Sequence, residues 1–227
     1  MPRDTVLFDI NETVLDLTAL RPKFEAALGD PAVASTWFAM LLHSSTVCAL
    51  TGVKTGFAEL AGLTLDRLAA LQGRTIGEDD RTDLLGAFAN LEPHADVAPA
   101  LARLRSRGYR TVAFSNSSLD LITRQIANSG LAGSFDAVIS VEEAGSFKPD
   151  AKVYAFAAAR LDRPIGALRL VAAHDWDTHG AMAAGMQAAY LDRTGAPYNP
   201  LYRRPEIQAR SMEDLAERII RADAGQT

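Results

Sequence analysis

The sequence has a single cysteine and no basic block, and each shortage excludes a class of protein or site. Cys48 is the single cysteine among 227 residues, so no internal disulfide and no cysteine-based metal cage can form. We therefore expect a reducing compartment, namely the cytoplasm. The net charge is −5 with no run of basic residues, which makes nucleic acid and anionic membranes poor partners. No uninterrupted run reaches about 18 apolar residues, and no charged-then-apolar leader precedes the first strand. We expect neither a membrane span nor a secretion signal.

Strands and helices alternate along most of the chain, and this order indicates a parallel sheet. The short apolar run 4–8 is typical of a buried strand. Further strands are expected at 110–115, 135–141, 168–173 and 187–191, with a helical pattern after each. Such alternation implies right-handed βαβ units. The predicted fold class is α/β, with a doubly wound, Rossmann-like core.

A long helical block interrupts this alternation after the first strand. Helices are predicted at 32–49, 54–72 and 79–89, and no strand is expected between 17 and 90. We therefore predict a helical cap formed by 16–92, inserted into a core formed by 1–15 and 93–227. Asp96 is expected to cap the next helix, and Ser211 to open the last one. His94, at the junction, is expected at the surface.

Polar side chains cluster at the predicted carboxyl ends of the core strands. Because these ends meet at one edge of a parallel sheet, the side chains should converge there. The residues are Asp9 and Thr13 after the first strand, Ser115 and Asn116 after the second, Lys148 after the third, and His174 to Asp177 after the fourth.

Asp9 is the candidate nucleophile of this cluster. A buried Asp9–Lys148 pair at about 4 Å gains on the order of 4 kcal/mol, which would keep both groups ionised. Asp177 offers Lys148 a second partner, and hydroxyl groups of Thr13 and Ser115 could orient Asp9. An ionised, partly desolvated carboxylate is a usable nucleophile, and a second carboxylate can position water to hydrolyse the resulting ester. Alternatively, Asp9 caps the turn that follows the strand.

The four motifs, in this order, resemble those of the haloacid dehalogenase superfamily, over nearly the whole chain. The resemblance implies a cap that closes over the active site, and most members are phosphatases. Phosphatases carry a general acid two residues after the nucleophile, where this chain has Asn11. They also hold Mg²⁺ with two acids around the fourth motif, and those positions fall on Ala173 and Asp177. We therefore predict neither a metal nor another cofactor.

Within the superfamily, the chain most resembles the (S)-2-haloacid dehalogenases. The segment from Lys148 to Tyr154 and the pair Trp176–Asp177 carry this likeness. It implies that Asp9 attacks C2, that Lys148 fixes Asp9, and that Asp177 activates the hydrolytic water. The remaining implied roles are substrate-carboxylate binding by Ser115 and the backbone N–H groups of Ile10 and Asn11, and lining of the halide side by Asn116 and Trp176.

Two departures from that group concern the substrate pocket. The arginine that contacts the leaving halide is replaced by Phe38, and His43 of the same helix is a candidate substitute. His174 stands where small polar residues are common, and it could donate to water or to an ester carbonyl. For His174, Phe38, Trp176 and Tyr154, packing in the core is the alternative to a place in the site.

The sequence therefore predicts metal-independent, hydrolytic dehalogenation of small 2-haloalkanoic acids to 2-hydroxy acids through an aspartyl ester. One alternative is a phosphatase or phosphonatase with an altered acid and metal site. Another is a binding protein that grips a carboxylate metabolite on the same scaffold. The resemblance also leads us to expect a homodimer.

Overall fold

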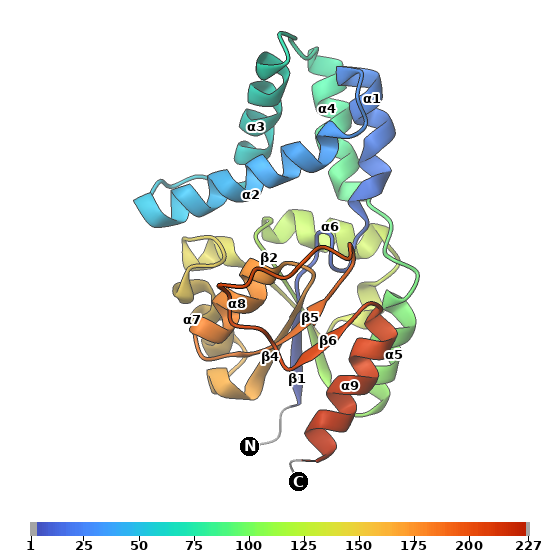
Figure 1. The fold of residues 1–227 in the computed structure, drawn as a ribbon, viewed down its shortest axis with the longest axis vertical. Helices are drawn as coiled ribbons and strands as arrows, with labels where there is room; N and C mark the ends of the chain where they lie inside the picture. Colours follow the sequence, from blue (N-terminus) through green and yellow to red (C-terminus); the bar gives the residue numbers. More distant parts are fainter. Residues whose placement is uncertain (1–3, 226–227) are drawn as a thin grey trace.

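The computed structural model describes residues 4–225, and its core is a six-stranded parallel sheet in the order β3-β2-β1-β4-β5-β6 (Figure 1). The central strand β1 pairs with β2 and β4, so that Phe8 lies beside Ala113 and Val171. Asp9, the next residue, therefore emerges at the middle of the carboxyl edge. The strands are β1 (Thr5–Phe8), β2 (Arg110–Ser115), β3 (Ala137–Ser140), β4 (Leu168–Ala172), β5 (Gln187–Leu191) and β6 (Ile207–Ala209).

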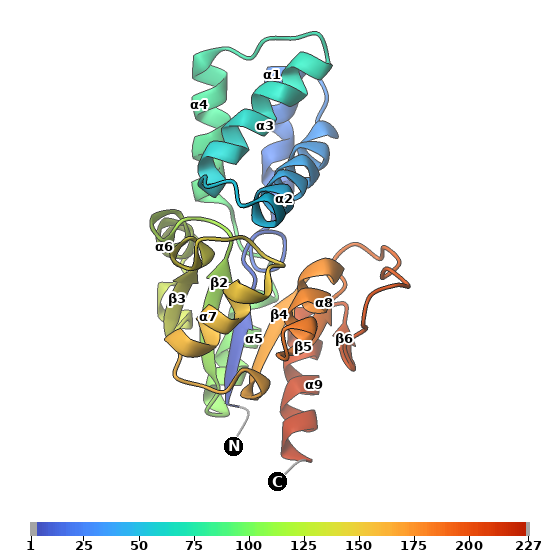
Figure 2. The ribbon, with the colours of Figure 1, turned by 90° about the vertical axis from the view of Figure 1, so that its left-hand side faces the viewer.

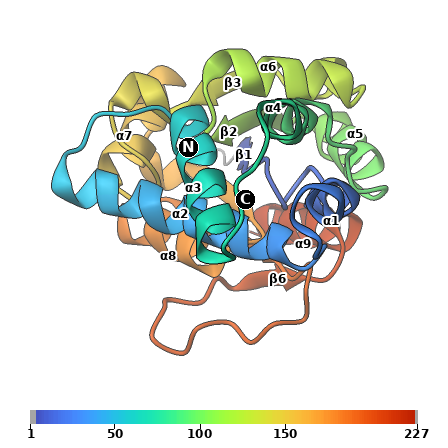
Figure 3. The ribbon, with the colours of Figure 1, turned by 90° about the horizontal axis from the view of Figure 1, so that it is seen from above.

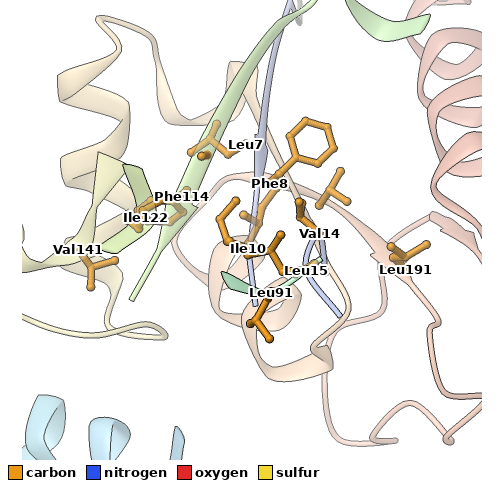
Figure 4. Packing of buried hydrophobic residues seen from close by; sticks show 14 of the residues in the cluster. Leu7, Phe8, Ile10, Val14, Leu15, Leu91, Phe114, Ile122, Val141 and Leu191 are labelled. Carbon is orange, nitrogen blue, oxygen red and sulfur yellow. The ribbon is translucent and has the colours of Figure 1, made fainter. Parts of the chain in front are cut away.

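Helices cover both faces of the sheet, which confirms the predicted α/β class. In Figures 1 and 2, α5 (Val97–Ser106) and α9 (Met212–Ala224) lie on one face, and α7 (Ala151–Arg160) and α8 (Asp175–Ala183) on the other. α6 (Leu119–Asn128) packs beside β3. Because both faces are covered, β1 is buried along its whole length, and Leu7 and Phe8 lie in one cluster with Phe114 (Figure 4).

The block between β1 and α5 folds into four helices that form a cap over the carboxyl edge of the sheet (Figures 1 and 2). The chain leaves and re-enters the core side by side, since Leu15 pairs with Pro93 and the Asp16 N–H donates to the Glu92 carbonyl at 2.8 Å. α2 is the cap helix nearest the core, and Figure 3 shows it running across the top of the sheet. The helices are α1 (Arg21–Leu28), α2 (Val33–Thr51), α3 (Phe57–Leu71) and α4 (Glu78–Ala87), with the 3-10 turns η1 (Leu17–Leu20) and η2 (Phe88–Asn90) at the two crossings.

Four details differ from the sequence predictions. The short strand β6 was not predicted, and α8 begins at Asp175, whereas the sequence pattern predicts that this helix begins at Asp177. Asp96 precedes α5, but its side chain does not cap that helix. By length and composition α2 could cross a membrane, a test that a buried core helix also passes and that the count of uninterrupted apolar residues did not indicate. Residues 1–3 and 226–227, the ends of the predicted core, lie outside the described residues.

Candidate active site

Asp9 lies at the centre of the carboxyl edge, under the cap. Its N–H extends the β1–β4 ladder by donating to the Val171 carbonyl at 3.0 Å. The Thr13 hydroxyl donates to Asp9 Oδ2 at 2.7 Å and accepts the Ala173 N–H at 2.9 Å. The loop after β1 is therefore fastened to the end of β4 through Thr13, and the Asp9 carboxylate, in a residue only 7% exposed, has a fixed orientation.

Lys148 joins the two aspartates that the sequence placed with it. Its Nζ donates to Asp9 Oδ1 at 3.1 Å, to Asp177 Oδ2 at 2.9 Å and to the Phe114 carbonyl at 2.9 Å. The Tyr154 hydroxyl donates to the other oxygen of Asp177 at 2.6 Å. All three protons of the buried ammonium have acceptors, so Lys148 is held as a cation between two carboxylates.

The charges of this cluster set the ionisation of its members. Burial alone would raise the pKa of Asp9, but Lys148 and His174 outweigh burial and hold that pKa far below its ordinary value. For Lys148, Asp177 and Asp9 outweigh burial and raise the pKa. The pKa of Asp177 is raised by its burial and by the charge of Asp9, despite Lys148. Asp9 is thus the carboxylate most firmly kept in its ionised form, as a nucleophile requires.

His174 forms a bridge between Asp9 and Glu12. Its Nδ1 lies 3.2 Å from Asp9 Oδ2, and its Nε2 lies 2.8 Å from Glu12 Oε2. Burial would lower the pKa of His174, but the hydrogen bonds to both carboxylates raise it to about 10. In the free protein His174 is therefore an imidazolium, and it places a second positive charge on Asp9.

Aromatic side chains from both the cap and the core surround His174. The Trp176 ring stacks on it with 5.3 Å between centroids, and the Phe38 ring of α2 lies 6.2 Å away. Phe38 also contacts Trp37 and Phe88 within the cap. Phe38 and Trp176 thus border the predicted site, and Phe38 is a cap core residue as well. His43, the suggested substitute for the missing arginine, is exposed on α2.

Two of the predicted residues support neighbouring loops. The Ser115 hydroxyl accepts the Ser117 N–H at 3.2 Å and makes no bond to Asp9 among residues 4–225, contrary to the expectation that it orients Asp9. Asn116 Oδ1 accepts the Lys148 N–H at 3.0 Å, which fixes the loop that carries the lysine.

Ile10 and Asn11 form the start of the loop after Asp9. Ile10 is fully buried, and its carbonyl accepts the N–H groups of Val14 and Leu15 (Figure 4). Asn11 donates to the Ser117 hydroxyl at 3.3 Å and accepts from Gln125 at 3.2 Å. Because Gln125 also donates to the Phe88 carbonyl at 2.7 Å, α6 ties this loop to the cap junction.

Sequence reasoning missed Glu12 as a partner of His174. Glu12 has φ +63, a left-handed conformation that a residue other than glycine rarely takes. This conformation is part of the turn that places the Glu12 side chain within reach of His174. The signal available in the sequence was a carboxylate three residues after Asp9, but nothing local predicted the turn.

The carboxylates of this site are not arranged to bind Mg²⁺, the metal that phosphatases of the haloacid dehalogenase superfamily use. The oxygens of Asp9 already face Lys148 and His174, and those of Asp177 face Lys148 and Tyr154. Within residues 4–225 no group of three or more metal-binding side chains is found. Mg²⁺ needs near-octahedral oxygen ligation, whereas this site presents two cationic side chains to the same carboxylate. The arrangement suits displacement by an ionised carboxylate.

Comparisons with known proteins agree with this geometry. Residues 3–171 match the family described as haloacid dehalogenase-like hydrolase. The chain is 30% identical to an (S)-2-haloacid dehalogenase of Xanthobacter autotrophicus, over 83% of this chain and 74% of the relative. It is 26% identical to an (S)-2-haloacid dehalogenase of Pseudomonas fluorescens, over 94% and 95%. A solved L-2-haloacid dehalogenase of Xanthobacter autotrophicus with chloropropionic acid covalently bound superposes with a TM-score of 0.88 at 25% identity, covering 96% of this chain and 98% of that one.

Proposed function

Because the chain belongs to the haloacid dehalogenase-like hydrolases, we propose that it hydrolyses the carbon–halogen bond of small 2-haloalkanoic acids to give 2-hydroxy acids. One observation carries this proposal: an ionised Asp9 is held by Lys148, Thr13 and His174, with an amide at position 11 where a phosphatase has its acid. Such a site supplies a nucleophile and two positive charges.

In the first step, an oxygen of Asp9 attacks C2 of the haloacid. The new C–O bond forms as the carbon–halogen bond breaks, and the halide leaves with the bonding electron pair. The halide needs no proton to leave, so this step does not require a general acid at position 11, where the chain has Asn11. Lys148 and Thr13 orient the attacking carboxylate, while Ser115 and the N–H groups of Ile10 and Asn11 bind the substrate carboxylate. Asn116, Trp176 and Phe38 line the halide side.

In the second step, water cleaves the ester. Once Asp9 is an ester it no longer carries a charge, so His174 loses one of the two carboxylates that raise its pKa. His174 then releases a proton to solvent, which is the proton that the overall hydrolysis yields. As a neutral base oriented by Glu12, it takes a proton from water, and the resulting hydroxide attacks the ester carbonyl. The acyl C–O bond then breaks, the departing alkoxide takes the proton of the attacking oxygen, and the 2-hydroxy acid leaves with Asp9 restored as a carboxylate and His174 as an imidazolium.

Asp177 is the alternative base for this water. Both of its oxygens already accept hydrogen bonds, from Lys148 and Tyr154, and the residue is fully buried. This environment favours a role in holding Lys148. In single-turnover experiments Glu12→Gln should slow ester hydrolysis selectively if His174 is the base. A selective block of that step in Asp177→Asn, with normal hydrolysis in Glu12→Gln, would assign the base to Asp177.

The decisive test of the activity is halide release. Purified protein should release chloride from 2-chloropropionate in the presence of EDTA, and Asp9→Asn should abolish this release. Asp120→Asn, at an exposed aspartate on α6, is the matched control and should retain full activity. Absence of release across a panel of haloacids, together with Mg²⁺-dependent cleavage of p-nitrophenyl phosphate, would instead establish the phosphatase alternative.

We further propose that the protein is a cytoplasmic homodimer. Support for a dimer comes from large apolar side chains that the cap exposes, among them Leu50 (82% exposed) and Leu71 (70% exposed). The free thiol of Cys48 suits a reducing compartment. Light scattering should give twice the mass of the 24.3 kDa chain, and Leu50→Lys should lower that mass. A monomer at all concentrations would refute the dimer.

A further inference from the structure

The loop that carries Glu12 is held in place by residues that lie outside the loop. Three successive carbonyl groups of this loop accept hydrogen bonds from two residues that are distant in sequence. The Glu12 carbonyl lies 3.2 Å from His94 Nε2, the Thr13 carbonyl accepts from Arg193 Nη2 at 3.0 Å, and the Val14 carbonyl accepts the His94 N–H at 3.0 Å. His94 was expected at the surface, but it is half-buried because it packs under this loop.

Arg193 is itself fixed by the core through Asp96. Arg193 donates to Asp96 Oδ2 at 2.7 Å, and the same oxygen accepts the Met212 N–H at 2.7 Å. Asp96 therefore links Arg193 to the first residue of α9, which explains why it does not cap α5. Burial and the charge of Arg193 lower the pKa of His94, so its ring is neutral at pH 7 and can donate from Nε2. His94 and Arg193 thus hold the loop by hydrogen bonds, and Asp96 links Arg193 to α9.

These hydrogen bonds to the loop matter because Glu12 has the left-handed backbone conformation. For a residue with a side chain this conformation is unfavourable and persists only when surrounding contacts hold it. His94 bonds the carbonyl of that same residue. Release of this carbonyl would let Glu12 relax toward an ordinary φ, which would carry its carboxylate away from His174 Nε2, 2.8 Å distant in the structure.

We propose that His94 and Arg193 are positioning residues for ester hydrolysis, which act by holding the Glu12 and Thr13 carbonyls so that Glu12 stays on His174. This inference rests on the proposed role of His174 and Glu12 in activating water. It gives His94, at the junction where the chain returns from the cap to the core, a role in positioning Glu12. His94 should therefore affect the second step of the reaction more than the first.

The test separates the two steps in single-turnover reactions with 2-chloropropionate. Mass spectrometry of the quenched protein measures the ester on Asp9, and product analysis measures its decay. His94→Phe keeps the ring but not the donor, and it should slow ester hydrolysis roughly tenfold or more while ester formation changes less than about threefold. His94→Gln retains an amide donor and should restore most of the rate. His179→Phe, at a histidine that does not touch the loop, is the control.

A double variant tests whether His94 acts through Glu12. Because Glu12→Gln already removes the partner of His174, adding His94→Phe should slow hydrolysis no further. If the Phe variant does not fold, His94→Asn, which is too short to reach the carbonyl, takes its place. Arg193→Met should slow both steps, since Thr13 bonds Asp9 itself.

Three results would overturn the inference: unchanged ester hydrolysis in His94→Phe, equal slowing of both steps in His94→Phe, or independent effects of the His94 and Glu12 substitutions. Each of these results requires a wild-type protein that forms and hydrolyses the ester. A wild-type protein that never labels Asp9 would instead refute the proposed function, so the two failures are distinguishable.

Discussion

Lys148→Met is the substitution whose effect on stability the structure predicts most sharply. The side chains are of similar length, so the change removes the charge and leaves most of the packing. Lys148 is only 1% exposed and lies 3.1 Å from Asp9 and 2.9 Å from Asp177. Each contact contributes about 5–6 kcal/mol of attraction at an effective dielectric of 20. Burial of the three ions opposes this, and removing one partner of a buried ion pair typically costs about 3–5 kcal/mol.

The loss should depend on pH, and its sign follows from the carboxylates. Removing Lys148 takes away a charge that lowers the pKa of Asp9 and that opposes the raised pKa of Asp177, so the folded-state pKa of both groups increases. In the wild type Asp9 stays ionised well below the unfolded value near 3.8, so part of the loss is already present at pH 4. As pH rises further, the variant must keep Asp177 ionised without a cation and Asp9 with His174 alone. The difference in stability from the wild type should therefore be larger at pH 8 than at pH 4.

Urea unfolding followed by circular dichroism at pH 4, 6 and 8 measures this difference. Lys152→Met is the matched control, because Lys152 is exposed on the adjacent helix, and this variant should unfold like the wild type at each pH. The reasoning would be refuted if Lys148→Met were as stable as the control at pH 8, or if its deficit shrank as pH rose. Either result would mean that the ammonium does not compensate the two carboxylates.

The remaining predictions concern other parts of the site. Asn11→Asp should not create Mg²⁺-dependent phosphatase activity, because two cationic side chains still face Asp9; turnover of p-nitrophenyl phosphate would disprove this. His174 has a folded-state pKa of about 10, so its stabilisation is complete below the unfolded value of 6.5 and is lost as pH rises through 10. The melting temperature should therefore fall over that range in the wild type and change less in His174→Gln. A Cβ on Gly180 would lie 2.6 Å from Pro149, so Gly180→Ala should destabilise the protein, whereas Gly86→Ala in an open helical position should stabilise it by about 0.5–1 kcal/mol, as melting curves would reveal.

Much of the fold could be predicted from the sequence because local patterns and burial agree. The strands buried on both faces are mostly apolar, and the glycines Gly108, Gly130 and Gly185 mark the ends of the helices that precede β2, β3 and β5. β6 was missed because a three-residue edge strand with one buried position carries little pattern. Asp96 was misassigned because its Oδ2 accepts from Arg193 and from the Met212 N–H, partners distant in sequence that no local rule reveals.

The candidate site was predictable where strand ends carry unusual polar residues. Asp9, Thr13, Lys148 and Asp177 meet as expected, because parallel strands deliver them to one edge. The His174–Glu12 bridge could not be predicted, since it depends on a left-handed residue that the sequence does not mark. Likewise His94 and Arg193 act on backbone carbonyls, which leave no signature in side-chain spacing.

A single turnover in ¹⁸O-labelled water, with enzyme in excess over 2-chloropropionate, tests the covalent route most directly. If the Asp9 carboxylate bonds to substrate carbon, the hydroxy acid leaves with an unlabelled oxygen, and the heavy isotope appears in the peptide that contains Asp9. Heavy oxygen in the first molecules of product, with none in that peptide, would contradict the account, because water would then have attacked the substrate itself.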